Sequence, residues 1–374
     1  LLDLSAAFDT VDHNTLLNRL QEQYGYSGDV LKWIKSYLTD RKQVIRAKGV
    51  ESDIFELKYG VPQGSVLGPE LFKDYIAPLY EIIRSYNVNP HGYADDTQIF
   101  KSFKPGKNEL EVLQNVENCI EGIRKWMGNS FLKLNDGKTQ FIIIGSKRNL
   151  EKVVTKSIKI GSYSIQAVEQ VKNIGAVFDK YMNMEAHLNA TCKAAWLSLY
   201  NISKIRQYLT YEQTETVMHA FVTSRLDQNN SLLVNLPNNQ VSRLQAIQNA
   251  AARIIKKRRK FDHVTPLLKE LHWLPIVKRP IFKILLLVFK TLRGEGPQYL
   301  MDLLVPYVPT VNLRSSTDQL LCVPKSKLVT YGDRAFSVIA PSLWNDLPIE
   351  IKDCDTVPIF KRKLKTYLFT QAYS

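Results

Sequence analysis

The chain has 374 residues, of which 45% are hydrophobic and 23% are charged. This balance excludes an intrinsically disordered chain and is typical of a globular protein with roughly two or three domains. The formal net charge of +14 favours a polyanionic partner, nucleic acid first, although a basic soluble protein without such a partner would look the same. Residues 1–180 carry 24 basic and 22 acidic side chains, and residues 181–374 carry 26 and 14, as expected of a catalytic unit followed by a substrate-holding unit.

Membrane, metal and secretion signals are missing from the sequence. No apolar run reaches the roughly 18 residues of a membrane span, and no secretory signal is found. The four cysteines lie far apart without zinc spacing, which predicts reduced thiols in an intracellular protein. The chain begins within what reads as a strand, Leu1 to Leu4, so we expect an N-terminal truncation.

The first half of the chain mixes helical and strand-like periodicities. Strands are expected at 1–4, 43–47, 54–58, 131–134 and 140–144, with a strand–turn–strand unit at 91–100 and a further strand within 171–178. Helices are expected at 12–20, 29–38, 69–84 and 110–126. The strand–turn–strand units predict an α+β fold in which an antiparallel sheet is backed by helices.

The second half reads as helical after about residue 183. Leu244, Ile247, Ala251 and Ile254 form one apolar helix face, and residues 282–292 form another apolar helix. Beyond about Asn312 the pattern indicates short strands and turns, followed by a basic helix at 357–369.

The strongest chemical signal is Tyr93-Ala94-Asp95-Asp96 between two strand-like stretches. Adjacent carboxylates at a hairpin tip repel each other, and a divalent cation relieves that repulsion. A third carboxylate on a neighbouring strand, for which Asp3 is the candidate, would complete a two-metal site for phosphoryl transfer. A solvated turn with two aspartates is the alternative.

Further blocks occur in a fixed order around this tetrapeptide. They are Leu2-Asp3-Leu4-Ser5-Ala6-Ala7-Phe8-Asp9, Gly60-Val61-Pro62-Gln63-Gly64-Ser65 and, after the tetrapeptide, residues 131–139, FLKLNDGKT. With them the sequence resembles the reverse transcriptases of LINE-type (non-long-terminal-repeat) retrotransposons. Residues 171–175, VKNIG, are similar to a variant of that family's primer grip. The stretches 219–227, 271–275, 314–316 and 340–345 also resemble the family, and packing in a helical region is the expectation for them.

The resemblance implies roles for individual residues. Asp3, Asp95 and Asp96 match the metal-binding carboxylates, for two Mg²⁺ ions with Mn²⁺ as a substitute, and Asp9 matches a structural position. Phe8 matches the steric gate that excludes a ribose 2′-hydroxyl, although a core aromatic would look the same.

Other matched positions concern the substrates. Gln63 and Gly64 match the block that contacts the template and the incoming nucleotide, and Ile174 and Gly175 match the primer grip. Lys138 matches a lysine that neutralises or protonates the leaving pyrophosphate, or it is a surface turn lysine.

The basic run of Lys256, Lys257, Arg258, Arg259 and Lys260 follows a predicted helix directly. It is expected either to contact nucleic-acid backbone or to be a solvated helix end favoured by the helix dipole. A nuclear localisation signal is a weaker reading, and the six histidines show no ligand spacing.

The resemblance implies a polymerase right-hand fold with a palm at 1–182, a helical thumb-like region at 183–262 and a C-terminal region of unknown role at 263–374. The fingers that precede the Asp3 block in this family are missing, so we expect this chain to polymerise poorly alone. The implied activity is RNA-directed DNA polymerisation with an RNA template, a DNA primer and deoxynucleoside triphosphates, in the nucleus or cytoplasm. A catalytically inactive nucleic-acid-binding remnant is the alternative. An RNA-directed RNA polymerase would share the carboxylates, but Phe8 argues against it.

Overall fold

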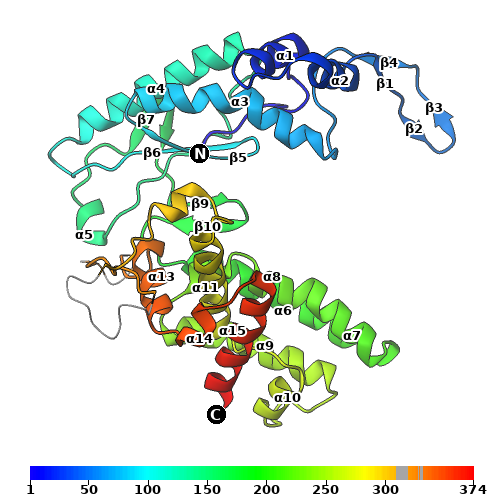
Figure 1. Ribbon diagram of the computed structural model, residues 1–374, viewed down its shortest axis with the longest axis vertical. Helices are drawn as coiled ribbons and strands as arrows, with labels where there is room; N and C mark the ends of the chain where they lie inside the picture. Colours follow the sequence, from blue (N-terminus) through cyan, green and yellow to red (C-terminus); the bar gives the residue numbers. More distant parts are fainter. Residues whose placement is uncertain (309–318, 327, 329–331) are drawn as a thin grey trace. The chain divides into compact units, whose positions relative to one another are not determined.

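The computed structural model describes residues 1–308, 319–326, 328 and 332–374. The chain divides into two compact units, Leu1–Val171 and Lys172–Ser374, and the elements of each are labelled in Figure 1. Each unit combines helices with two-stranded sheets, as expected for an α+β chain. Among the described residues no helix is long and apolar enough to cross a membrane.

The first unit contains four long helices and one short one. They are α1 (His13–Glu22), α2 (Gly28–Leu38), α3 (Leu67–Ser85), α4 (Glu109–Asn129) and α5 (Lys147–Leu150). The four long ones confirm the predicted helices within a few residues at each end. Asp12 caps α1, because its side chain accepts a hydrogen bond from the Thr15 N–H at 2.7 Å, which satisfies one of the free donors of the first turn.

The strands of the first unit pair in twos. The pairs are β1 (Arg41–Gln43) with β4 (Phe55–Leu57), β2 (Arg46–Ala47) with β3 (Val50–Glu51), β5 (Asn89–Tyr93) with β6 (Asp96–Phe100), and β7 (Ser157–Ile160) with β8 (Tyr163–Gln166). All four pairs are antiparallel. The strands expected at 43–47 and 54–58 were predicted to pair around a Lys48-Gly49 turn, and that pairing is wrong: residues 46–47 pair with 50–51 around this turn, while 55–57 pair with 41–43.

The β5–β6 hairpin is extended by single bridges to two other segments. Leu2 bridges antiparallel to Thr97 of β6, and Leu4 bridges antiparallel to Leu134. The predicted strands at 131–134 and 140–144 are therefore wrong as regular strands, because each contributes only one bridging residue, Leu134 or Phe141, in the described chain. Among the residues that the structure describes, the segment at 131–134 pairs with the Asp3 segment only at Leu4, and the segment at 140–144 pairs only at Phe141, with Ala167.

The core of the first unit lies between α1, α3 and α4. Tyr75 of α3 is fully buried and donates its hydroxyl to the Ser130 carbonyl at 2.6 Å. Arg19 of α1 lies over the rings of Tyr75 and Trp126 and donates to the Ser130 hydroxyl at 2.7 Å. Burial lowers the pKa of Arg19, so the aromatic faces and oxygen acceptors must replace the water that a cation would otherwise keep.

The second unit begins with a hairpin and continues as helices. Its elements, including the last residues of the first unit, are β9 (Gln170–Asn173), β10 (Ala176–Asp179), α6 (Glu185–Ile205), η1 (Arg206–Tyr208), α7 (Tyr211–Met218), η2 (His219–Thr223), α8 (Ser224–Asp227), η3 (Asn230–Leu233), α9 (Asn238–Ile255), α10 (Thr265–Glu270), α11 (Lys278–Leu292), α12 (Gln298–Met301), α13 (Phe336–Asn345), α14 (Ile349–Lys352) and α15 (Val357–Tyr373). The predicted strand within 171–178 is thus confirmed as a hairpin of two strands. The apolar face predicted on α9 is buried at Leu244, Ile247 and Ala251.

Two of the later family-like stretches are joined by specific contacts. Arg279 donates to both carboxylate oxygens of Asp227 at 2.9 and 2.8 Å and also to the Leu274 carbonyl. His219 lies edge-on to Trp273 with ring centroids 5.5 Å apart. These contacts support the packing role expected for 219–227 and 271–275.

The expectation of short strands and turns beyond Asn312 is wrong for residues 336–352, which form α13 and α14. Trp344 is 1% exposed, and its burial holds α13 in place although Pro341 lies inside the helix. Asn345 connects the stretch 340–345 to Leu321, because its side-chain oxygen accepts from the Leu321 N–H and its side-chain nitrogen donates to the Leu321 carbonyl. Residues 314–316 lie outside the described residues.

Candidate active site

The two central aspartates lie at the tip of the β5–β6 hairpin. Tyr93 pairs with Asp96, so Ala94 and Asp95 form a two-residue turn. Ala94 has a φ of 52°, a left-handed conformation that alanine adopts at a cost of about 1–2 kcal/mol. The tight turn exposes Asp96 and half-buries Asp95.

Asp3 lies on the extended segment beside this hairpin. Leu2 and Leu4 are buried at 3% and 6% exposure, and side chains of an extended chain alternate between faces. Asp3 therefore projects to the opposite, more open face, and its side chain is 38% exposed. Backbone bonds from Leu2 to Thr97 and from Asn135 to Asp3 fix the segment between β6 and the 131–139 block.

The three carboxylates act on one another. The pKa of Asp96 is raised, first by partial burial and then by the negative charges of Asp95 and Asp3. Lys138 supplies the nearest opposite charge, with its Nζ atom 4.0 Å from the Asp3 Oδ2 atom, but it is 72% exposed. The result is a small region of concentrated negative charge that one surface lysine screens weakly.

The donor chemistry of this region fits a divalent cation. Carboxylate oxygens are the hard ligands that Mg²⁺ and Mn²⁺ prefer, and a bound cation would offset both the partial burial and the neighbouring charges that raise the pKa of Asp96. Within the described ranges, however, no group of three or more His, Cys, Asp or Glu side chains lies close enough to hold one ion. The carboxylates are thus electrostatic neighbours without forming a closed ligand set.

Phe8 is half-buried and packs on α3. Its ring stacks on Phe72 with centroids 4.7 Å apart and an interplanar angle of 26°, and Phe72 is fully buried. No sequence pattern indicated Phe72, which lies 64 residues away. The stacking fixes the position of the Phe8 ring, whether that ring serves the core or a substrate.

The block at 60–65 is bonded to the loop that follows Asp3. The Val61 N–H donates to the Phe8 carbonyl at 2.8 Å, and Gln63 Nε2 donates to Asp9 Oδ1 at 2.9 Å. A Cβ atom on Gly60, whose φ is +89°, would meet the Asp9 backbone at 3.0 Å. Glycine is therefore required for this close approach, and it brings Gln63 and Gly64 beside the Phe8 loop.

His13 adds a contact to this junction that the sequence did not indicate. Its Nε2 atom lies 2.8 Å from the Gly60 carbonyl, so the first residue of α1 also holds the loop. Among the described residues the His13 side chain bonds a backbone carbonyl and no titratable group, so the geometry supports a role in positioning the 60–65 loop.

Ile174 and Gly175 form the turn of the β9–β10 hairpin in the second unit. Both have positive φ, 44° and 77°, as a two-residue hairpin turn of this kind requires. A β-branched residue in this conformation is a backbone outlier, and Ile174 remains 43% exposed. The Asn229 side chain donates to the Ile174 carbonyl at 2.9 Å and holds the turn.

The members of the basic run differ in their surroundings. Lys256 is 16% exposed, pairs with Glu270 and lies over the Tyr211 ring. The hydrogen bond that Lys256 donates to Glu270 raises the pKa of Lys256. The four residues from Lys257 to Lys260 are exposed, and in the part of the chain that the structure describes none of them has a carboxylate partner on its side chain.

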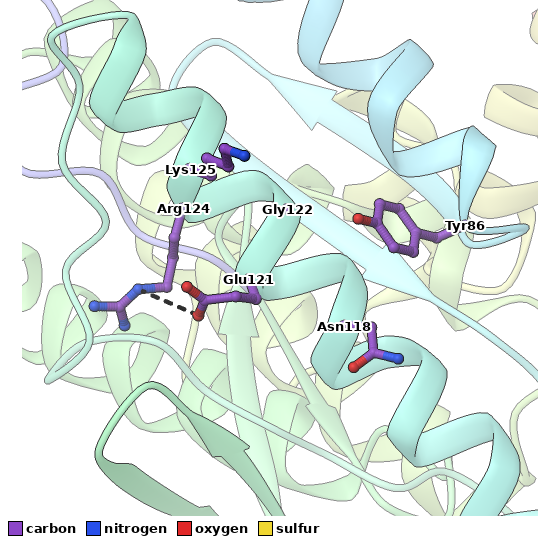
Figure 2. A pocket seen from close by; sticks show the side chains of 6 residues that line it. All are labelled: Tyr86, Asn118, Glu121, Gly122, Arg124 and Lys125. Carbon is purple, nitrogen blue, oxygen red and sulfur yellow. Dashed lines mark ion pairs between the residues drawn. The ribbon is translucent and has the colours of Figure 1, made fainter.

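A shallow hollow of about 640 Å³ lies elsewhere on the first unit (Figure 2). It is lined by Tyr86 and by Asn118, Glu121, Gly122, Arg124 and Lys125 of α4. Figure 2 shows Arg124 turned toward Glu121, 4.0 Å apart, and Arg124 also pairs with Asp136 at 3.0 Å. Arg124 and Glu121 are thus paired within the protein, and none of the predicted site residues lines the hollow.

Comparison with known proteins defines the class. Residues 1–178 match the family described as reverse transcriptase (RNA-dependent DNA polymerase). This part of the chain is similar to a reverse transcriptase domain, and the relatives below, all named as RNA-directed DNA polymerases of transposons or mobile elements, support the resemblance to LINE-type retrotransposon reverse transcriptases.

Three Drosophila melanogaster proteins illustrate the relationship. The chain is 27% identical over 225 residues to "Probable RNA-directed DNA polymerase from transposon BS", which covers 58% of this chain and 23% of that protein. It is 24% identical to "RNA-directed DNA polymerase from mobile element jockey" over 50% of this chain and 20% of that protein. It is 22% identical to "Probable RNA-directed DNA polymerase from transposon X-element" over 68% and 28%. The chain thus spans about a quarter of the length of these relatives.

Proposed function

We propose that this chain carries the catalytic palm of an RNA-directed DNA polymerase, with Asp3, Asp95 and Asp96 as its catalytic carboxylates. The observation that supports this proposal is the charge cluster in which Asp95 and Asp3 both raise the pKa of Asp96. Three carboxylates from a hairpin tip and an adjacent extended segment are held together against their mutual repulsion, which is the arrangement that a divalent cation stabilises.

Asp3, Asp95 and Asp96 would hold two Mg²⁺ ions, with Mn²⁺ as an alternative. Bound metal would supply charge neutralisation for the attacking hydroxyl and the triphosphate. The contribution of the protein is to orient the carboxylates. The backbone bonds of the Asp3 segment to Thr97 and Asn135 would do this for Asp3, and Lys138, beside Asp3, would neutralise the pyrophosphate leaving group.

Phe8, Gln63 and Gly64 would form the nucleotide-binding surface. Phe72 backs the Phe8 ring, so the ring cannot retreat from a ribose 2′-hydroxyl without disturbing a fully buried neighbour. Gln63 is oriented by Asp9, and Gly64, with φ of +79° and no atom within 4 Å of an added Cβ, leaves its backbone open to a substrate.

The second unit would hold the nucleic acid. Ile174 and Gly175 would grip the primer end, residues 183–262 would act as the thumb, and residues 263–374 would brace it through contacts such as Arg279 to Asp227. The substrates would be an RNA template, a DNA primer and deoxynucleoside triphosphates, in keeping with the RNA-directed DNA polymerase names of the relatives.

Primer extension on an RNA template with Mg²⁺ tests the proposal. The proteins compared are residues 1–374 alone and a chimera in which these residues replace the matching segment of the BS polymerase. Extension by the chimera that Asp3→Ala or Asp95→Ala abolishes, while Asp53→Ala leaves it intact, is the expected result. A folded chimera that binds primer–template but does not extend it would instead support a catalytically inactive nucleic-acid-binding remnant.

A further inference from the structure

The second unit carries an exposed loop that combines cations with an aromatic ring. This loop, residues 257–261, follows the end of α9 and is held by its own hydrogen bonds. Arg253 donates from its Nε and a terminal nitrogen to the Asp262 carbonyl at 3.0 and 2.9 Å. The Arg259 N–H donates to Asp262 Oδ2 at 3.0 Å, and the Arg258 N–H donates to the Arg253 carbonyl at 2.9 Å. The backbone of the loop is therefore fixed while its side chains point to solvent.

Phe261 ends this loop and is 90% exposed. Burying a phenylalanine is worth about 1.5–3 kcal/mol, so leaving this ring in water forgoes that stabilisation. Lys260 lies over the ring with its Nζ atom 5.6 Å from the centroid. An aromatic face beside a cation is the combination that binds a stacked base and its phosphate.

A second exposed aromatic side chain belongs to a segment that is bonded to the end of α9. Tyr208 of η1 is 79% exposed. Its segment is tied to the end of α9 by Arg206, which donates to the carbonyls of Ile254 and Ile255 at 3.1 and 3.0 Å. Tyr211, just beyond, carries Lys256 over its ring at 4.6 Å. The end of α9 thus carries cations that lie over aromatic rings of two segments, Lys256 over Tyr211 and Lys260 over Phe261.

The nearby acidic groups do not neutralise the loop. Glu270 pairs with Lys256, and Asp262 accepts from the Arg259 backbone. The positive charge of Lys257, Arg258, Arg259 and Lys260 is accordingly available to a polyanion, whereas Lys256 is engaged with Glu270 and braces the loop.

We propose that Lys257, Arg258, Arg259, Lys260, Phe261 and Tyr208 form a binding site for single-stranded nucleic acid. The cations would contact phosphates, and Phe261, with Tyr208, would stack on unpaired bases. A single strand is favoured over a duplex because the faces of bases inside a duplex are covered by their neighbours, whereas an exposed ring needs an open base face. The inference deepens the proposed function by adding a contact for template or product outside the catalytic centre, and its test measures binding rather than synthesis.

The test is fluorescence anisotropy of residues 1–374 with labelled single strands of sixteen uridines or sixteen thymidines, and with a duplex of equal length. Neutralising Lys257, Arg258, Arg259 and Lys260 together to glutamine should reduce the slope of log affinity against log salt by about 3, because each phosphate contact contributes about 0.7 for a single strand. The matched control neutralises Lys361, Arg362, Lys363 and Lys365 of α15, which changes the net charge by the same amount. An equal effect of both variants would show a general charge effect and overturn the site.

The stacking half is tested separately. Phe261→Ala should weaken single-strand binding about tenfold and leave duplex binding unchanged, Phe261→Tyr should restore it, and Phe221→Ala, at a ring that is 54% exposed, should have no effect. Unfolding is not a confounding outcome for a side chain this exposed, and circular dichroism checks it. Binding that Phe261→Ala does not weaken, or weakens equally for the duplex, overturns the proposal.

The two uncoupled outcomes distinguish this site from the catalytic proposal. Loop-dependent binding without polymerisation would leave the site standing and remove the proposed activity. Polymerisation without loop-dependent binding would leave the proposed activity standing and remove the site. The uridine and thymidine strands show whether RNA or DNA is preferred.

Discussion

The repulsion among the three carboxylates predicts that removing one of them stabilises the metal-free protein. Two carboxylates about 5 Å apart in a water-like dielectric repel each other by about 0.8 kcal/mol. Asp3 and Asp96 are at least one third exposed, so solvent screening keeps the repulsion energy near this water-like value. Asp95→Asn should therefore stabilise the metal-free chain by about 1 kcal/mol or less, a rise of about 2–4 °C in Tm for a unit of this size.

Divalent metal should reverse the order of stabilities. At a Mg²⁺ concentration ten times the Kd, the native chain should gain about 1.4 kcal/mol by mass action, whereas Asp95→Asn, which lacks a ligand, should gain much less. Thermal unfolding followed by circular dichroism, with EDTA and with a Mg²⁺ series, measures both effects. Asp53→Asn is the matched control, since Asp53 is an exposed aspartate on the same unit, and it should follow the native chain.

Two results would refute this reasoning. Equal Mg²⁺ stabilisation of Asp95→Asn and the native chain would remove Asp95 from the metal ligands. An Asp95→Asn protein that is less stable than the native chain in EDTA would mean that the carboxylate is a structural hydrogen-bond acceptor and that the charge cluster carries no strain.

Four further predictions concern other parts of the two units. The raised pKa of Asp96 means that the protonated carboxyl favours the folded state, so without metal this contribution to stability is lost as the pH rises from the ordinary value of 3.8 through the raised pKa. Asp96→Asn should remove this pH dependence of stability, and identical pH–stability curves for the native chain and Asp96→Asn would contradict the prediction. Phe8→Val in the extension-competent chimera should raise ribonucleotide incorporation relative to deoxynucleotide, measured by primer extension with each, and unchanged selectivity would assign Phe8 to the core alone. Ile174→Asn should stabilise the chain by about 1 kcal/mol in denaturant unfolding, because asparagine tolerates positive φ, while it lowers primer extension. A variant that loses both stability and extension would indicate that Ile174 packs within the protein and does not grip the primer. Gly92→Ala should cost about 1–3 kcal/mol because its Cβ would lie 1.8 Å from the Tyr80 hydroxyl, and Tyr80→Phe should recover part of that loss, so additive effects of the two changes would argue against the contact.

The sequence by itself determined the local elements of the site. The run Tyr93-Ala94-Asp95-Asp96 between strand-like stretches predicts a hairpin with two carboxylates at its tip, since a two-residue turn and its flanking alternation are set by neighbouring residues. The helices α1 to α4 and α9 were predicted for the same reason, because their apolar periodicity is written along a continuous stretch. The chemistry of a two-metal site called for a third carboxylate on a neighbouring strand, for which Asp3 was the candidate, and the resemblance matched the same residue.

Only the tertiary structure decided which distant groups meet. Leu2 pairs with Thr97, and Phe8 stacks on Phe72, contacts that no local pattern specifies because they depend on how segments 60 or more residues apart pack. Lys256 looks like its four neighbours in sequence but is set apart by Glu270 and Tyr211. Burial of Trp344 likewise supports a helix, with Pro341 inside it, where the sequence pattern indicated short strands and turns. The charged residues could be identified from the sequence, whereas which of them stay available to a substrate depends on the side chains that the fold places beside them.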